Sequence, residues 1–412
     1  MPQRSIKSIL AALLILLVLL ATVSFVNSPG TDDVALYWVP WAEHAADLGG
    51  PAGFARDEAQ YGYPPYGSVI LASAVRLGRA LGIGTFEALK WSLVVFLLAA
   101  SALVWLWTRS VIVAALFGLA LLLNSVALGY IDIYFAPTLI LALWALKVRK
   151  WIWFVVFFSA ACLTKWQPVL IAPFIVLYIL DIQHIRHWRQ IDFKRLAVTI
   201  LLPAAIMLGI TLLVFEAAPL ASSLSKALNN EFLSGNALNF SWIETHWLHV
   251  FYPDEFGGLI GGEAGYIVSD ALRVTLLPKV LFFLTYAVTI AAFFKREKTF
   301  ENLINFSLIG YLAYFTFNTG VHENHLFLAV ILAVILFWIN LEQLSVMLIL
   351  VFMSNINLVL FYGIDGQELP FSRVIANTVD VALLLSIFNV VFFVLLWAAN
   401  TLPRKQTARG NS

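Results

Sequence analysis

Two adjacent carboxylates, Asp32 and Asp33, are the first residues of the chain with an evident capacity for chemistry. They directly follow a long apolar segment, and a helix beginning there would place Asp33, Tyr37 and Trp41 on one face, at positions i, i+4 and i+8. A carboxylate held beside a substrate hydroxyl can act as a general base. Asp is also a good helix N-cap, and acidic residues stabilise the first turn of a helix. The sequence therefore leaves both roles open.

The same segment continues with Glu58 and the run Tyr61-Gly62-Tyr63-Pro64-Pro65. Prolines fix an extended backbone, and tyrosines are common where a helix meets the membrane surface. An aromatic belt followed by a turn explains this run in structural terms. Its position in the same segment as the acidic pair favours a binding role as well.

A lysine, Lys165, interrupts thirty apolar residues within Thr164-Lys165-Trp166-Gln167-Pro168. A cation between two apolar helices needs a partner or water, which makes it a candidate functional residue. The alternative is that its side chain extends to the membrane surface. An ammonium group is a good point charge for a phosphate, so we predict a lipid phosphate as its ligand.

Four consecutive polar residues, His322-Glu323-Asn324-His325, join two apolar segments. Histidines in zinc-binding helices are spaced i, i+4, whereas these are spaced i, i+3 and the sequence offers no third ligand. We therefore favour hydrogen-bond donors for a phosphate or a sugar, with a solvated turn as the alternative.

A second group of amides, Asn236 and Asn239, stands close to Trp242. Amides beside an aromatic ring suit the hydroxyls and the ring face of a sugar. Asn side chains that bond their own backbone in a turn would give the same pattern.

The elements that position these residues are predicted to be membrane helices. The 412 residues are 61% hydrophobic and only 12% charged, about half the charge of an average globular chain. A net charge of +1 gives no basic field, so we expect no nucleic-acid partner. The single cysteine, Cys162, excludes an intramolecular disulfide.

Apolar runs of about 20 residues can cross a bilayer as helices. The predicted membrane-spanning runs are 8–26, 88–107, 111–128, 133–146, 197–215, 274–294, 303–317, 326–339, 343–362 and 376–399. The segment 151–180 is expected to form two short helices that meet at Lys165–Pro168, because a proline and a lysine are costly inside one span. We thus predict an all-α polytopic protein with about twelve spans, eleven to thirteen, in a single transmembrane domain over residues 1–412.

The distribution of Lys and Arg predicts the orientation. With the N-terminus in the cytoplasm, sixteen of the 25 basic residues fall on the cytoplasmic side. They are Arg4, Lys7, Arg109, Lys147, Arg149, Lys150, Arg186, Arg189, Lys194, Arg195, Lys295, Arg296, Lys298, Arg404, Lys405 and Arg409. The long loops 27–84 and 217–272 are then extracytoplasmic, and loops of this length usually carry function. Both termini are expected in the cytoplasm, and the active site outside.

The motifs in this order resemble the GT-C superfamily of membrane glycosyltransferases. Asp32-Asp33 occupies the place of the acidic pair that this superfamily carries after its first span. The start Asp33-x-x-x-Tyr37 followed by Tyr63-Pro64-Pro65 resembles the family-87, mannosyltransferase-like branch. Lys165-Trp166-Gln167-Pro168 is similar to its Lys-Pro-Gln-Pro segment, with Trp166 in place of the first proline. Asn236–Asn239 and Val321–His325 resemble loop motifs of many members.

The resemblance implies transfer of a hexosyl or pentosyl group from a polyprenyl-phosphate donor to a hydroxyl of a glycan, glycolipid or protein. It implies a setting among membrane lipids, expected to be the bacterial inner membrane, with helices from the outer loops lying near the membrane surface. A divalent cation, Mg or Mn, assists some relatives, and the sequence does not decide whether it does so here.

Roles follow for the singled-out residues. We expect Asp33 to be the general base, with Asp32 as second candidate and Glu58 as helper, and the sugar to be transferred with inversion. Lys165, His322 and Arg373 are the candidates for stabilising the donor phosphate. The candidates for sugar or acceptor binding are Tyr37, Tyr61, Tyr63, Gln167, Asn236, Asn239, Trp242, Glu323, Asn324 and His325.

Two other functions fit a polytopic chain. A lipid-linked polysaccharide polymerase or ligase would be expected to use arginines in its outer loops, whereas carboxylates dominate here. A transporter or flippase would be expected to contain broken helices in related halves, and only the break at 164–168 qualifies.

Overall fold

The computed structural model describes residues 3–181, 193–229, 231–269, 271–366, 372–375 and 379–402. Over these residues the chain is an all-α membrane protein with one short antiparallel ribbon, β1 (Val374–Ile375) and β2 (Val379–Asp380). The basic residues expected on the cytoplasmic side at Arg186, Arg189, Arg404, Lys405 and Arg409 lie outside the described residues.

Each apolar run predicted to span the membrane contains a helix over most of its described residues, although the run 376–399 begins with strand β2 where it is described. The helices are α1 (Gln3–Ser24), α5 (Thr85–Thr108), α6 (Val111–Leu122), α7 (Ala136–Lys147), α8 (Trp151–Thr164), α9 (Ala172–Leu180), α11 (Leu202–Phe215), α15 (Leu272–Phe294), α16 (Phe300–Phe317), α17 (Phe327–Ile339), α18 (Leu344–Tyr362) and α19 (Val381–Thr401). Within the described residues, five helical segments are long and apolar enough to cross a membrane: Thr85–Thr108, Ala197–Phe215, Leu272–Phe294, Leu341–Tyr362 and Val381–Thr401. Five shorter apolar helices accompany them, and the count of twelve spans stays a prediction.

Helix α17 forms the centre of the bundle. All of its residues from Phe327 to Leu336 are buried, and it packs against α6, α16 and α18. Helix α11 is the opposite case, because it leaves side chains such as Leu213 and Ile210 exposed along its length. Exposed apolar faces of this kind are what lipid solvates, and helices in lipid associate chiefly through close packing.

The predicted break between two short helices is present at Lys165. Helix α8 ends at Thr164, Lys165 is extended with φ −152° and ψ 137°, and a 3-10 turn over Gln167–Ile171 leads into α9. Pro168 sits in the first turn of that segment, where a missing N–H costs nothing. The break turns the Lys165 side chain into the interior of the protein.

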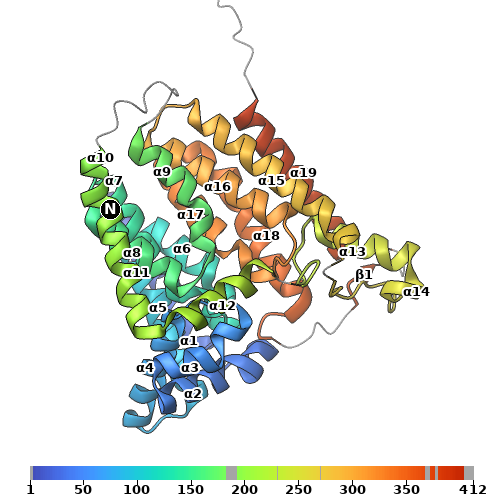
Figure 1. Cartoon of the computed structure of the whole chain (residues 1–412). Coiled ribbons are helices and arrows are strands. Elements are labelled where there is room, and N and C mark those ends of the chain that lie inside the picture. Colours follow the sequence, from blue (N-terminus) through green and yellow to red (C-terminus); the bar gives the residue numbers. More distant parts are fainter. Residues whose placement is uncertain are drawn as a thin grey trace, which may run out of the picture.

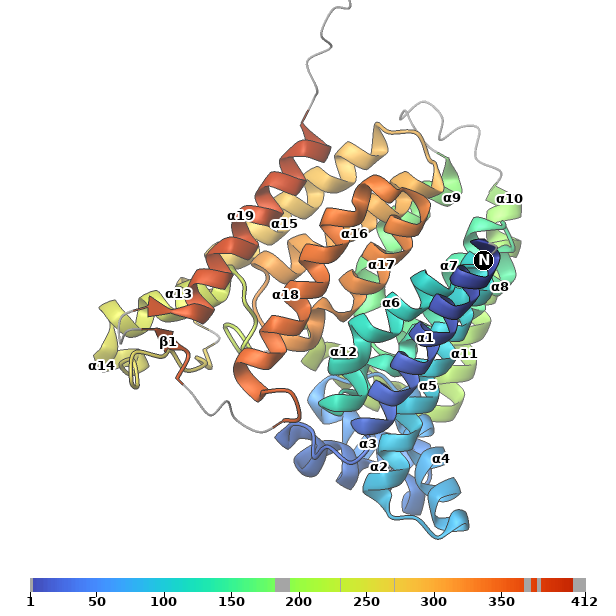
Figure 2. The same ribbon diagram turned by 180° about the vertical axis from the view of Figure 1, so that it is seen from behind.

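The loop helices gather at one end of the bundle. They are α2 (Val39–Leu48), α3 (Gly50–Arg56), α4 (Tyr66–Leu81), α12 (Ala217–Leu228), α13 (Phe240–Phe251) and α14 (Pro253–Phe256). Figures 1 and 2 show them at the end opposite to the start of α1. The short helix α10 (Phe193–Leu196) precedes α11 and lies near the start of α1. The segments that carry the candidate residues therefore lie at one common end.

Candidate functional site

Two pockets share a wall at the end of the bundle where the loop helices lie. We call them the acidic pocket, of about 340 Å³, and the lysine pocket, of about 240 Å³. The acidic pocket is lined by Asp33, Tyr37, Trp38, Trp41, Tyr130, Phe232, Gly235, Asn236, Tyr266, Glu323, Asn324 and Tyr362, and the lysine pocket by Gly62, Pro64, Lys165, Trp166, Gln167, Val169, Leu170, Leu224, Lys226, Ala227, Leu228, Tyr314 and Gly320. The residues that line both are Tyr61, Tyr63, His322 and His325.

Asp33 faces the acidic pocket from the start of a π-helical turn, Val34–Trp38, that leads into α2. Among the described residues its side chain makes no capping hydrogen bond, so the capping role is not supported. The neighbouring Asp32 is exposed and lines neither pocket. Single π-helical turns occur often at functional sites, and here the turn separates two adjacent acids into one that faces the pocket and one that faces out.

The predicted face of Asp33, Tyr37 and Trp41 is formed, because all three residues line the acidic pocket. The rings of Tyr37 and Trp41 lie 5.7 Å apart, and Tyr61 lies 5.3 Å from each of them. Burial raises the pKa of the Asp33 carboxyl above its ordinary value, and Lys165 opposes that shift. A carboxylate made more basic in this way is better suited to accept a proton.

Lys165 lines the lysine pocket and forms an ion pair with Asp132. Its Nζ lies 3.3 Å from Oδ2 of Asp132 and 4.3 Å from the centre of the Tyr63 ring, and its side chain is only 10% exposed. Burial and an ion pair exclude the alternative that this lysine extends to the membrane surface. Gln167 lines the same pocket, is 6% exposed, and its amide N and O have no hydrogen-bond partner within the described ranges. It is therefore poised to hydrogen-bond a ligand.

The polar segment 322–325 joins the two pockets through its hydrogen bonds. The Tyr130 hydroxyl donates to Glu323 Oε1 at 2.5 Å, and Asn324 Nδ2 donates to Asp132 Oδ2 at 2.9 Å. The Tyr314 hydroxyl is 3.1 Å from Nδ1 of His325. These contacts hold the segment 322–325 in place between the two pockets, so it is not a solvated turn.

Gly235 holds this wall in place from the second long loop. Its N–H donates to the carbonyl of Val321 at 2.8 Å, and its carbonyl accepts from the N–H of Glu323 at 3.0 Å. A Cβ at position 235 would lie 2.4 Å from Nδ1 of His322, so the close approach needs glycine. Burial, and then the charge of Lys165, lower the pKa of His322 to about 4. His322 therefore offers a neutral imidazole at neutral pH.

Four other residues singled out from the sequence lie away from the pockets. Asn239 is buried and caps α13 by accepting from the N–H of Trp242 at 3.0 Å. Trp242 is 1% exposed and packs edge-on against Phe361. Glu58 is 1% exposed, and neither of its carboxylate oxygens has a hydrogen-bond partner in the part of the chain described. Asn239 and Trp242 thus serve the core.

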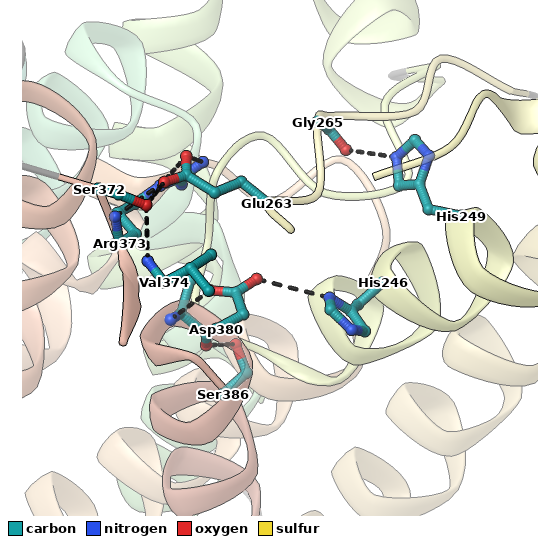
Figure 3. A network of polar contacts seen from close by, with 10 residues as sticks. His246, His249, Glu263, Gly265, Ser372, Arg373, Val374, Asp380 and Ser386 are labelled. Atoms are coloured by element: carbon teal, nitrogen blue, oxygen red, sulfur yellow. Dashed lines mark hydrogen bonds and ion pairs between the residues drawn. The ribbon is translucent and has the colours of Figure 1, made fainter. Parts of the chain in front are cut away.

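Arg373, the fourth, is already paired. Its Nε and Nη2 donate to Oε2 of Glu263 at 3.0 and 2.9 Å, and Figure 3 shows this pair beside Ser372. The same view shows Asp380 facing His246, with 3.5 Å between the carboxylate and Nδ1. Arg373 lines neither pocket, so the structure does not bring it to the site.

The structure adds residues that sequence reasoning missed, namely Asp132, Tyr130, Lys226 and Tyr362. Asp132 is 1% exposed and is the partner of Lys165. The signal that could have found it is a lone carboxylate within an apolar stretch, since such groups need a named partner. Among the described residues, no group of three His, Cys, Asp or Glu side chains is placed so that it could hold a metal ion. We assign no metal.

The arrangement places a carboxylate and a buried cation on two sides of one wall made by two tyrosines and two histidines. Such a site can remove a proton on one side and hold an anion on the other. No protein-family model, curated protein or solved structure matches this chain.

Proposed function

We propose that this protein is an integral-membrane glycosyltransferase that takes a hexosyl or pentosyl group from a polyprenyl-phosphate donor. The observation that carries the proposal is the shared wall between the acidic pocket and the lysine pocket. The donor phosphate would lie in the lysine pocket and the reacting sugar at the wall. The acceptor hydroxyl, from a glycan, glycolipid or protein, would enter on the side of Asp33.

The lysine pocket has the chemistry of a lipid phosphate site. Lys165 supplies a charge and Gln167 supplies an unpartnered amide, while Val169, Leu170, Leu224 and Leu228 supply apolar surface. A phosphate attached to an isoprenoid chain needs both kinds of contact. Lys226 at the same pocket adds a second cation.

The reaction then proceeds as a single displacement. The Asp33 carboxylate accepts the proton of the acceptor hydroxyl as its oxygen attacks the anomeric carbon. The bond between that carbon and the phosphate oxygen breaks, and its electron pair leaves with the phosphate. Lys165 and Gln167 stabilise the charge that develops there. Attack from the face opposite to the leaving phosphate inverts the anomeric centre.

The proposal includes an orientation and a membrane. Helices α2 and α12, which contribute residues to the two pockets, lie at the end of the bundle opposite to the start of α1. Arg109 and Lys295 follow directly on α5 and α15, and Lys147 is the last residue of α7, at the other end. Basic residues favour the cytoplasmic side. The pockets would then open on the extracytoplasmic side of a bacterial inner membrane.

The test is sugar transfer by the purified full-length chain in lipid nanodiscs. Farnesyl-phosphate-linked and undecaprenyl-phosphate-linked hexoses and pentoses are supplied with a mixture of lipid, glycan and peptide acceptors, and loss of labelled sugar from the donor is measured. We expect transfer from a monophosphate-linked donor that Lys165→Met combined with Asp132→Asn abolishes, because replacing both partners of the buried pair preserves folding. A chain that accepts only diphosphate-linked glycans would instead be a polymerase or ligase. Movement of labelled lipid across the bilayer without transfer would identify a flippase.

A further inference from the structure

The walls of the acidic pocket contain carboxylates and no fixed positive charge. Asp33 and Glu323 line the pocket, and within the described ranges no lysine or arginine does. Its two imidazoles come from His322 and His325, and the lowered pKa of His322 leaves that ring neutral. Lys165 belongs to the neighbouring pocket and is already paired with Asp132.

Most of the other residues that line the acidic pocket are aromatic. They are Tyr37, Trp38, Trp41, Tyr61, Tyr63, Tyr130, Phe232, Tyr266 and Tyr362. Tyr37, Trp41 and Tyr61 pack against one another with centroids between 5.3 and 5.7 Å apart. The face of an aromatic ring carries negative potential and attracts cations. Such rings also give flat apolar surface to the C–H face of a sugar, and they carry no net positive charge that could pair with an anion.

Two buried polar atoms of the wall await a partner. Trp38 is 2% exposed and Asn324 is 4% exposed. In the described part of the chain, Nε1 of Trp38 and Oδ1 of Asn324 have no hydrogen-bond partner. The Nδ2 atom of Asn324 donates to Asp132, which identifies Oδ1 as the free acceptor. One N–H donor and one carbonyl acceptor match hydroxyls, which both donate and accept.

We propose that the acidic pocket selects a sugar ring without negative charge, neutral or amino-substituted, and discriminates against uronic acids and sulfated sugars. An anionic substituent would meet Asp33 in a confined space whose described walls hold no cation, and buried like charges are unfavourable. Burial raises the pKa of Glu323 to about 7, so Glu323 adds a second negative charge above that pH. An ammonium substituent would meet two carboxylates and aromatic faces. The inference rests on the proposed function only where it assigns the bound sugar ring to the donor or to the acceptor. Binding itself needs no turnover.

The test uses matched methyl glycosides of the gluco, galacto and manno series, each as neutral sugar, 2-amino sugar and uronate. Binding to the full-length chain in nanodiscs is measured by quenching of tryptophan fluorescence and by saturation-transfer NMR. We expect at least one series to bind, with the uronate about tenfold or more weaker than its neutral counterpart, which is about 1.4 kcal/mol. Farnesyl phosphate alone should leave the bound methyl glycoside in place. A farnesyl-phosphate hexose should displace the glycoside if the acidic pocket holds the sugar of the donor. It should leave the glycoside bound if the pocket holds the sugar of the acceptor.

Variants locate the discrimination in the pocket. Asp33→Asn combined with Glu323→Gln removes both carboxylates and should bring uronate binding to within about threefold of the neutral sugar. Gln at 323 can still accept from Tyr130, so the wall keeps its hydrogen bond. Glu87→Gln, at an exposed position in the first turn of α5, serves as the matched control and should leave the preference unchanged. Three results would each overturn the inference, whatever the transfer assay gives. The wild type could bind uronate and neutral sugar equally, or it could bind no glycoside of any series. The double variant could also keep the preference of the wild type.

Discussion

The Nζ of Lys165 lies 3.3 Å from Oδ2 of Asp132, and both side chains are buried where two short helices meet. A buried ion pair is sensitive to the loss of either partner, because the remaining charge is left uncompensated at a cost of about 3–5 kcal/mol. Replacing both partners with uncharged residues is much better tolerated. The pair therefore offers a way to separate folding from ligand binding at the lysine pocket.

We predict that Asp132→Asn lowers the melting temperature of the purified protein strongly, and that adding Lys165→Met to it restores most of the loss. The double variant should fold yet fail to bind farnesyl phosphate, because the cation is gone. Thermal unfolding in detergent and binding of farnesyl phosphate check the two halves. Normal farnesyl phosphate binding by the folded double variant would remove Lys165 from the phosphate site.

Gly235 gives a steric prediction. Ala at this position brings a Cβ to 2.4 Å from the His322 ring, so the wall between the pockets must shift. Overpacking of this kind costs about 1–3 kcal/mol, and we expect transfer to fall about tenfold or more while the helices stay intact. Gly209→Ala is the control, because no atom lies within 4 Å of the Cβ it would add to α11. Equal transfer rates in the two variants would contradict the assigned role of this wall.

Glu58 gives a prediction on stability and pH. Burial raises its pKa from 4.5 to about 8, so the folded protein holds a proton that the unfolded chain releases near pH 4.5. The resulting stability is fully present below pH 4.5 and is lost as the pH rises towards about 8, by on the order of a few kcal/mol. Glu58→Gln, which stays neutral, should therefore melt at a higher temperature than the wild type at pH 8 and at a similar one at pH 4.5. An identical pH dependence of melting in the two proteins would contradict a buried, protonated Glu58.

The pH dependence of transfer follows from Asp33. A general base works only when deprotonated, and burial raises the pKa of this carboxyl. The rate constant kcat should thus be high above that pKa and fall as the pH is lowered through it, with a midpoint above that of an ordinary Asp. Single-turnover rates between pH 4 and pH 8 give the profile. A flat profile over this range would argue against a carboxylate base.

Much of the architecture was predictable from the sequence, because apolar runs and a lysine in mid-segment are strong signals in lipid. The break at Lys165 followed from the cost of a lysine and a proline inside one span, and the common end of Asp33 and His322 followed from the order of the spans. Hydrophobicity and spacing do not say which way a loop side chain points, and this is why Trp242 and Asn239 were expected to bind sugar although they pack in the core.

Ion pairs between residues far apart in the sequence could not be predicted either. Glu263 lies 110 positions before Arg373 and neutralises it, and Asp132 lies 33 positions before Lys165. Neither partner is marked by a motif. The sequence identified the two cations and could not tell that one faces a pocket and the other is held in a loop.

The adjacent acids at the start of the site differ in their surroundings, and this sharpens the mechanism. Asp33 faces the acidic pocket and makes no capping hydrogen bond within the described residues, whereas Asp32 is exposed. Asn and Asp are comparable N-caps, so exchanging either one should leave folding intact. Asp32→Asn is therefore a matched control for Asp33→Asn.

The most direct measurement is the single-turnover rate of sugar transfer by Asp33→Asn, with the donor bound at saturation. Loss of a general base slows a reaction by about 10²–10⁴-fold, so we expect Asp33→Asn to bind the donor as tightly as the wild type and to transfer sugar at least about a hundredfold more slowly. Asp32→Asn should transfer within about twofold of the wild type. If Asp33→Asn keeps the wild-type rate, Asp33 is not the base and the mechanism proposed for this site is wrong.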